Sequence, residues 1–176
     1  MAKIANTRFA AACGKERRTP MKAWKLCLLA LVPGVLGWAG NWLTALSLNG
    51  PAFLFTPVFY IQAPAAIVFC LWLGHLCGRS ERSYPASLLL TQWPSLASFA
   101  LYVWQFHFVS DEARSFLLAG LGQYPGIPLF SLACRLVIPF SDHSWGQPET
   151  LAANALSLLM LAVLFSLGFL WGRRRR

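Results

Sequence analysis

The chain has 176 residues, of which 57% are hydrophobic and 12% are charged, and its formal net charge is +9. Soluble domains carry about 25% charged residues, so the composition argues against an ordinary soluble domain and favours a membrane protein. The basic residues lie at the ends of apolar segments and do not line one face of a domain, which argues against nucleic-acid binding. The basic residues are better explained by contact of these ends with the anionic lipids of the bilayer.

Residues 1–22 are strongly basic and are predicted to form a disordered N-terminal segment. Met21 precedes a second basic-then-apolar pattern, so it is an alternative start of the protein. The first span is predicted at about 26–48. Gly37-Trp38-Ala39 resembles a signal-peptide cleavage site, but the apolar stretch runs on to Leu48, beyond the about 7–15 residues of a signal sequence. An uncleaved span is therefore the favoured interpretation.

The second and third spans are predicted at about 53–77 and 86–109. Pro64 and Pro94 lie inside them and predict kinks, because proline removes a backbone donor and clashes with the preceding turn. Within a membrane such a proline is tolerated where neighbouring groups satisfy the freed carbonyl.

The segment 113–140 is apolar but is interrupted by several glycines and prolines, and it contains Arg135. Three interpretations compete: two helices lying in the exterior interface, a re-entrant hairpin packed against the other helices, or a fifth span. A spanning helix would place Arg135 in hydrocarbon at a cost of about 2.5–3.5 kcal/mol. The sequence therefore favours a broken interfacial or re-entrant helical segment.

The last span is predicted at about 150–172, and it is followed by the tetra-arginine tail 173–176. No residue from Leu151 to Trp171 is charged, and this length matches the about 20 residues that cross a bilayer. The expected fold is thus an all-α membrane protein with four transmembrane helices, formed by a single helical membrane domain over residues 23–172.

The distribution of lysine and arginine predicts the orientation. Of the 15 basic residues, seven lie between Met1 and Lys25, before the first span, two in the loop at Arg79–Arg82 and four in the tail, whereas Arg114 and Arg135 fall on the other side of the membrane. Basic loops stay on the cytoplasmic face, so both termini are predicted to be cytoplasmic. The sharp asymmetry and the short loops favour a prokaryotic plasma membrane.

Polar residues within the predicted spans are the default candidates for function. All of them are amides or imidazole, and none is a carboxylate, which counts against ion-coupled transport. The structural interpretation is that they bond neighbouring helices. They are Asn41, Gln62, Gln92, Gln105, His107 and Asn154.

Two GxxxG motifs, Gly74–Gly78 and Gly168–Gly172, each place two glycines on one helix face. Both motifs lie at the predicted cytoplasmic ends of their helices, so they face either each other or a partner chain. Packing within one chain is favoured over a homo-oligomer. Trp38 and Trp42 share a face of the first span and are interpreted as ordinary packing residues.

No catalytic, cofactor or metal site is predicted. His75 lies near Cys70 and Cys77, but zinc needs four ligands, or three with a water, and the other histidines fall on the opposite side. His143 with Asp142 and Ser144 has the residue types of a triad, but triads are assembled in space and not from sequence neighbours.

The leading functional hypothesis is a non-catalytic accessory or complex-forming component of a membrane, with a helix-packing protein partner or a second copy. The first alternative is a transporter or channel component for an uncharged or apolar solute, using Gln62, Gln92 and Asn41 at the proline kinks. The second is a membrane enzyme at the exterior interface. It would require five residues to converge: Asp111, Glu112, Arg135, Asp142 and His143.

Overall fold

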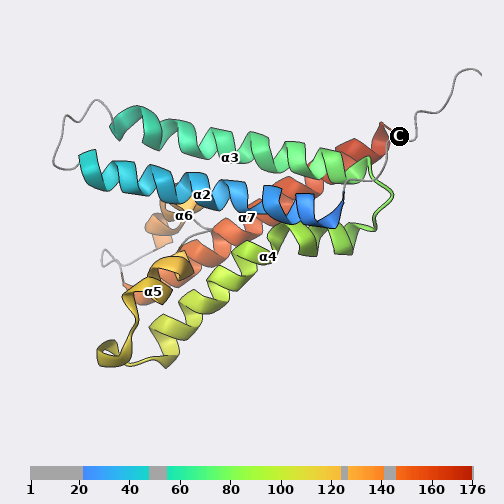
Figure 1. Cartoon of the computed structure of the whole chain (residues 1–176). Helices are drawn as coiled ribbons and strands as arrows, with labels where there is room; N and C mark the ends of the chain where they lie inside the picture. Colours follow the sequence, from blue (N-terminus) through green and yellow to red (C-terminus); the bar gives the residue numbers. More distant parts are fainter. Residues whose placement is uncertain (1–21, 48–54, 124–126, 141–145, 176) are drawn as a thin grey trace, which may run out of the picture.

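The computed structural model describes residues 22–47, 55–123, 127–140 and 146–175. Within these ranges every regular element is a helix, which confirms the all-helical prediction there (Figure 1). The long helices are α2 (Ala23–Ser47), α3 (Phe55–Gly78), α4 (Tyr84–Val103) and α7 (Gln147–Arg174), and the short ones are α5 (Phe116–Gln123) and α6 (Ile127–Val137). A π-helical turn at Trp104–Phe108 extends α4, and single 3-10 turns lie at Asp111–Ala113 and Ile138–Phe140.

The four long helices agree with the four predicted apolar segments to within a few residues, the π-helical turn completing the third segment. Pro33, Pro64 and Pro94 all lie inside helices. The expectations about the N-terminal segment and the alternative start at Met21 concern residues outside the described part of the chain.

Local sequence sets where α4 and α7 begin. α4 follows Ser83, whose backbone is extended, and Pro85 lies in its first turn, where a proline costs no helical hydrogen bond. α7 follows Gly146, whose backbone N–H donates to the Glu149 carboxylate over 2.8 Å. A carboxylate in the first turn also faces the positive end of the helix dipole, so this bond favours starting the helix here.

Helices α3 and α7 pack against each other along the centre of the bundle, and α2 lies beside α3 (Figure 1). α4 packs on α2 and α7 near its start and then diverges from α3 toward its end (Figure 1). Two apolar clusters fill the spaces between the helices. One comprises Leu26, Leu73, Cys77, Phe165 and Phe169, and the other Ala63, Ala66, Cys70, Leu129 and Leu161.

The short helix α5 lies along the second half of α4. The residue before its start, Ser115, bonds Gln105 near the far end of α4, and Leu121 near its end bonds Ser98 in the middle of α4. α5 therefore runs back along α4 toward the centre of the molecule.

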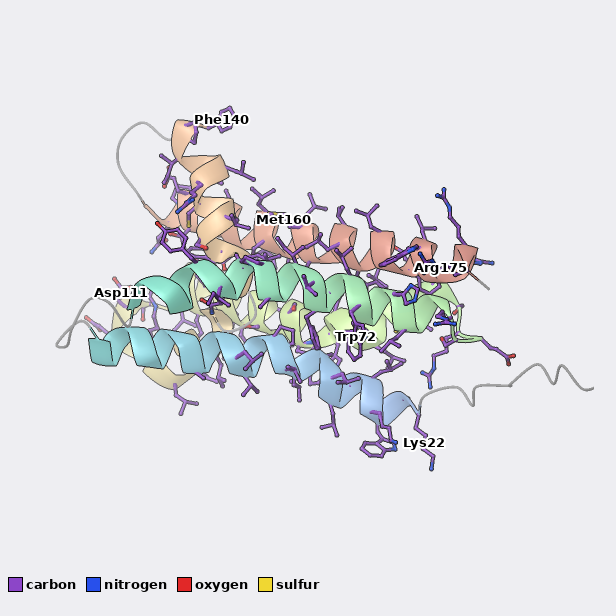
Figure 2. All side chains as sticks on the ribbon, turned by 90° about the horizontal axis from the view of Figure 1, so that it is seen from above. Lys22, Trp72, Asp111, Phe140, Met160 and Arg175 are labelled. Atoms are coloured by element: carbon purple, nitrogen blue, oxygen red, sulfur yellow. The ribbon has the colours of Figure 1, made fainter. Side chains whose placement is uncertain are left out.

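The helix α6 begins deep in the bundle and leaves it sideways. Leu129, in its first turn, is fully buried in the cluster that contains Cys70 and Leu161. Figure 2 shows α6 projecting from the bundle, with Phe140 at the tip of the following turn. The segment 113–140 thus contains two short helices. The end of α5 contacts the middle of α4, and the start of α6 contacts the middle of α3 and α7.

Two of the helical stretches in the described part are long and apolar enough to cross a bilayer, namely Tyr60–Gly78 and Gln147–Arg174. Leu129–Phe140 is apolar but shorter, and so is Ala23–Leu36, the part of the 25-residue helix α2 whose side chains are described without a gap. α4 has 20 residues, and its buried positions are occupied by polar residues, which lower its hydropathy. The structure therefore supports spanning character for two of the four predicted spans.

Candidate functional site

The two GxxxG motifs face each other in the contact between α3 and α7. A methyl group built on Gly74 would meet the Phe165 carbonyl and lie 2.9 Å from the Phe169 nitrogen. On the other helix, a methyl on Gly168 would lie 3.0 Å from Leu71 Cα, and one on Gly172 3.0 Å from His75 Cα. Because only glycine allows the backbones to approach this closely, the motifs serve packing within the chain.

We call the four residues Gly74, Gly78, Gly168 and Gly172 the glycine contact. It brings the basic ends of the two helices together, since a methyl on Gly78 would lie 3.1 Å from the Arg173 nitrogen. The Arg79–Arg82 loop and the arginine tail therefore lie at the same end of the molecule. Lys22 and Arg175 mark this end in Figure 2, and Asp111 lies at the opposite end.

The buried face of α4 is polar along its whole length. Its buried residues are Ser87, Thr91, Gln92, Ser98 and Tyr102, and Gln105 continues the series in the π-helical turn. Its exposed face, in contrast, carries large apolar residues. These are Leu89, Trp93, Leu96, Trp104 and Phe108.

Two of these polar residues bond the ends of α5. The Ser98 hydroxyl donates to the Leu121 carbonyl, and the Gln105 side-chain carbonyl accepts from the Ser115 N–H over 3.2 Å. The backbone groups at the ends of a helix have no partner inside it, so these bonds satisfy groups that burial would otherwise penalise. Gly122 completes the contact, because a methyl there would lie 2.8 Å from the Tyr102 nitrogen.

A small cavity lies among α2, α3, α4 and α7, beside Pro33 and Pro94. Thr91, Gln92 and Ser95 supply its polar wall, and its volume is about 20 Å³. A cavity of this size holds about one water molecule. The Thr91 hydroxyl donates to the Ser87 carbonyl over 2.8 Å, so this part of the polar wall is bonded within its own helix.

The amides predicted as candidates do not gather around this cavity. Gln92 lines it, but Gln105 lies 13 residues further along, which is about 20 Å of helix. The Asn154 side-chain nitrogen donates to the Thr150 carbonyl over 3.0 Å. The nitrogen of the Gln62 amide is buried and has no hydrogen-bond partner among the described residues.

The other polar candidates of the predicted spans form no cluster among the described residues. His107 is exposed and meets the Tyr102 ring edge-on, with centroids 6.5 Å apart. The side chains of Asn41, Trp38 and Trp42 lie outside what the structure describes.

An enzyme site on the predicted exterior side would need several charged residues to converge. Those that the structure describes lie apart. Arg114 pairs with Asp111 over 2.6 Å, donates to the Gln105 backbone carbonyl over 3.0 Å, and lies over the Phe106 ring. Arg135 lies against a different helix, α3, where it lines a groove beside Pro64. Asp142 and His143 are outside the described residues.

The thiols and imidazoles form no metal centre in the described part of the chain, where no group of three or more potential ligands comes together. The His75 ring contacts the Trp171 ring at a tilt of 49°, with centroids 4.8 Å apart, and its Nδ1 is buried.

No protein-family model matches the chain, and no similar curated protein or solved structure is found. Inferences about function therefore start from the residues and contacts described above.

Proposed function

We propose that the chain is a four-span integral membrane protein that acts as a non-catalytic component of a membrane assembly. The observation that carries the proposal is the inverted distribution of polarity across α4. Its buried residues are hydroxyls, an amide and a tyrosine, whereas Leu89, Trp93 and Leu96 are exposed. Water would favour the reverse arrangement, but hydrocarbon favours apolar side chains outside and polar groups bonded within.

The exposed faces of the other helices also indicate a hydrocarbon environment. Each exposes large apolar side chains along its outer face, which in water would form an extensive apolar patch. They include Leu28, Val35, Ile61, Val68, Trp72, Leu159, Val163, Leu167 and Leu170.

The lengths of the four helices fit four crossings. α2 has 25 residues, and α4 with its π-helical turn covers Tyr84–Phe108. Twenty-five helical residues extend about 37 Å, which exceeds the roughly 30 Å of hydrocarbon. Lys22 and Arg175 lie at one end, where Gly78, which precedes the basic loop, also meets Arg173, and this gathering supports a cytoplasmic location for both termini of the chain in a prokaryotic plasma membrane.

The proposed position of the four helices in the membrane also favours a re-entrant arrangement of α5 and α6. α5 runs from the level of Gln105 to the level of Ser98, which is close to the middle of the third span. α6 starts beside Cys70 and Leu161, close to the middle of two other spans. α5 therefore ends and α6 begins near mid-depth, which favours a re-entrant segment packed against the other helices.

The non-catalytic role is supported by how the polar groups are used. Ser98 and Gln105 join helices, Thr91 bonds its own helix, and the cavity beside Pro33 and Pro94 has room for only about one water. The face of α4 that remains outside offers the surface for a partner helix. Ala97 and Ala100 are exposed there, and small residues allow helices to approach closely in a membrane.

The test is purification of the native protein in a mild detergent, followed by mass spectrometry of the intact complex. We expect a stoichiometric partner chain or second copy that is lost in Ala100→Trp on α4. Ala155→Trp, at an exposed position on α7, is the matched control and should keep the partner. A lone monomer from the native membrane in every mild detergent would contradict the assembly role.

A transporter component for a small uncharged solute is the second candidate. The observation in its favour is the polar-walled cavity between the proline-containing parts of α2 and α4. Because the cavity has room for about one water, transport would require these helices to separate. Glycerol-driven swelling of proteoliposomes tests this: swelling that Gln92→Leu abolishes would favour transport, and no swelling above protein-free liposomes would eliminate it.

A further inference from the structure

A groove of about 240 Å³ lies between α3 and α6, beside Pro64. Its walls are apolar where Ile67 and Leu132 line it, and polar where Ser131 and Arg135 line it. The groove exists because small side chains, Ala63 on α3 and Ser131 on α6, lie where the two helices diverge.

Polarity changes between the two walls of this groove. On α3, Tyr60 lies near the exterior end of the span and Ile67 lies two turns further in, a depth of about 10 Å. On α6, Leu132 packs against the buried cluster, and Arg135 lies one turn further from it. The groove is therefore cationic at its outer end on α6 and apolar where it meets the buried cluster.

The charge of Arg135 is unmatched in the described structure. Its side chain is exposed, and no described carboxylate lies within ion-pairing distance of it. Arg114, the other exterior arginine, is in contrast held by Asp111 and Gln105. A guanidinium presents donors in a planar fork that matches the oxygens of a phosphate.

We propose that this groove binds an anionic phospholipid of the exterior leaflet, with the phosphate on Arg135 and Ser131 and part of an acyl chain beside Ile67 and Leu132. The inference rests on the proposed membrane embedding of the chain. The apolar depth of the groove distinguishes a lipid from a soluble phosphate, which would use the arginine alone. A net negative headgroup matches the single positive charge better than a zwitterionic one, whose own cation offsets its phosphate.

The test is titration of the detergent-solubilised full chain with dioleoyl-phosphatidylglycerol or dioleoyl-phosphatidylcholine, with bound lipid counted by native mass spectrometry. We expect tighter binding of the phosphatidylglycerol and a loss of about tenfold in that affinity in Arg135→Gln, equivalent to one charge-assisted hydrogen bond. Arg114→Gln is the matched control and should keep the wild-type affinity, because its charge is already paired. Ser131→Leu, which fills the groove, should weaken binding even if Arg135→Gln fails to fold.

Three results would overturn the lipid site: equal affinities for the two lipids, wild-type affinity in both Arg135→Gln and Ser131→Leu, or a large gain in affinity in Asp142→Asn. The last result would mean that Asp142 neutralises Arg135 in the native chain. A chain that stays monodisperse without detergent would refute the membrane proposal itself, so the two failures are distinguishable.

Discussion

The α3–α7 contact and the α4–α5 contact join helices by different means. Between α3 and α7, four glycines bring the backbones together without a side-chain hydrogen bond across the glycine contact in the described structure. Between α4 and α5, Ser98 and Gln105 supply hydrogen bonds to backbone groups, and Gly122 contributes one close approach. The first contact depends on shape and the second on satisfying polar groups.

This difference follows from what each helix needs. α3 and α7 are long, and their backbone groups are largely satisfied internally, so close packing and dispersion are sufficient to join them. α5 has eight residues, so a large share of its backbone groups have no partner inside the helix. A short helix in an apolar environment therefore requires polar side chains from a neighbour, and α4 provides them.

The largest expected effect is at the glycine contact. Gly168→Leu places a side chain against the Leu71 backbone, which cannot move without separating α3 from α7. We expect a loss of about 3 kcal/mol or more in the free energy of unfolding, measured by denaturant titration in micelles. Gly120→Leu is the control, because Gly120 is exposed and a methyl built there meets nothing within 4 Å. Equal stability of the two variants would show that the helices are not in close contact.

A smaller and more local effect is expected at Gly122. Gly122→Ala brings a methyl within 2.8 Å of the Tyr102 nitrogen, so α5 has to shift away from α4 at a cost of about 1–3 kcal/mol. Hydrogen exchange should accelerate in α5 and remain slow in α7. Gly120→Ala, two residues away on the same helix, should leave exchange unchanged or slow it, since alanine favours helix by about 1 kcal/mol.

The smallest expected effect on stability distinguishes a hydrogen bond between two helices from a hydrogen bond within one helix. Ser98→Ala removes the donor to the Leu121 carbonyl of α5 and should cost about 1–2 kcal/mol. Thr91→Val removes a hydroxyl that bonds only its own helix, at Ser87, so we expect a smaller loss. Thermal unfolding of both variants in the same detergent measures the difference. A Thr91→Val variant less stable than Ser98→Ala would contradict the assigned roles.

The sequence predicted the helices well because apolar runs and their breaks are local properties. The predicted last span at 150–172 and the observed α7 differ by a few residues, since Pro148 and Glu149 extend the first turn. The sequence did not decide whether the two GxxxG motifs meet each other, because a motif defines a helix face but not the neighbour of that face.

The polar face of α4 was only partly anticipated. Gln92 and Gln105 stood out as amides, but Ser87, Thr91 and Ser98 passed as ordinary small residues of a span. Their spacing, together with Tyr102, follows one helical face and was the available signal. The sequence left 113–140 open between interfacial and re-entrant positions, because no local pattern encodes which part of a neighbouring helix a short helix contacts.

Cysteine labelling tests the central claim most directly, namely that an apolar bundle crosses the bilayer with its basic ends on one side. Single cysteines replace Glu81, Glu112 and Arg175 in a chain whose five native cysteines are removed. In intact cells, a membrane-impermeant maleimide should label the position of Glu112 and should reach those of Glu81 and Arg175 only after permeabilisation. Labelling of the Glu81 and Arg175 positions from opposite faces, or equal labelling of all three before permeabilisation, would contradict the account.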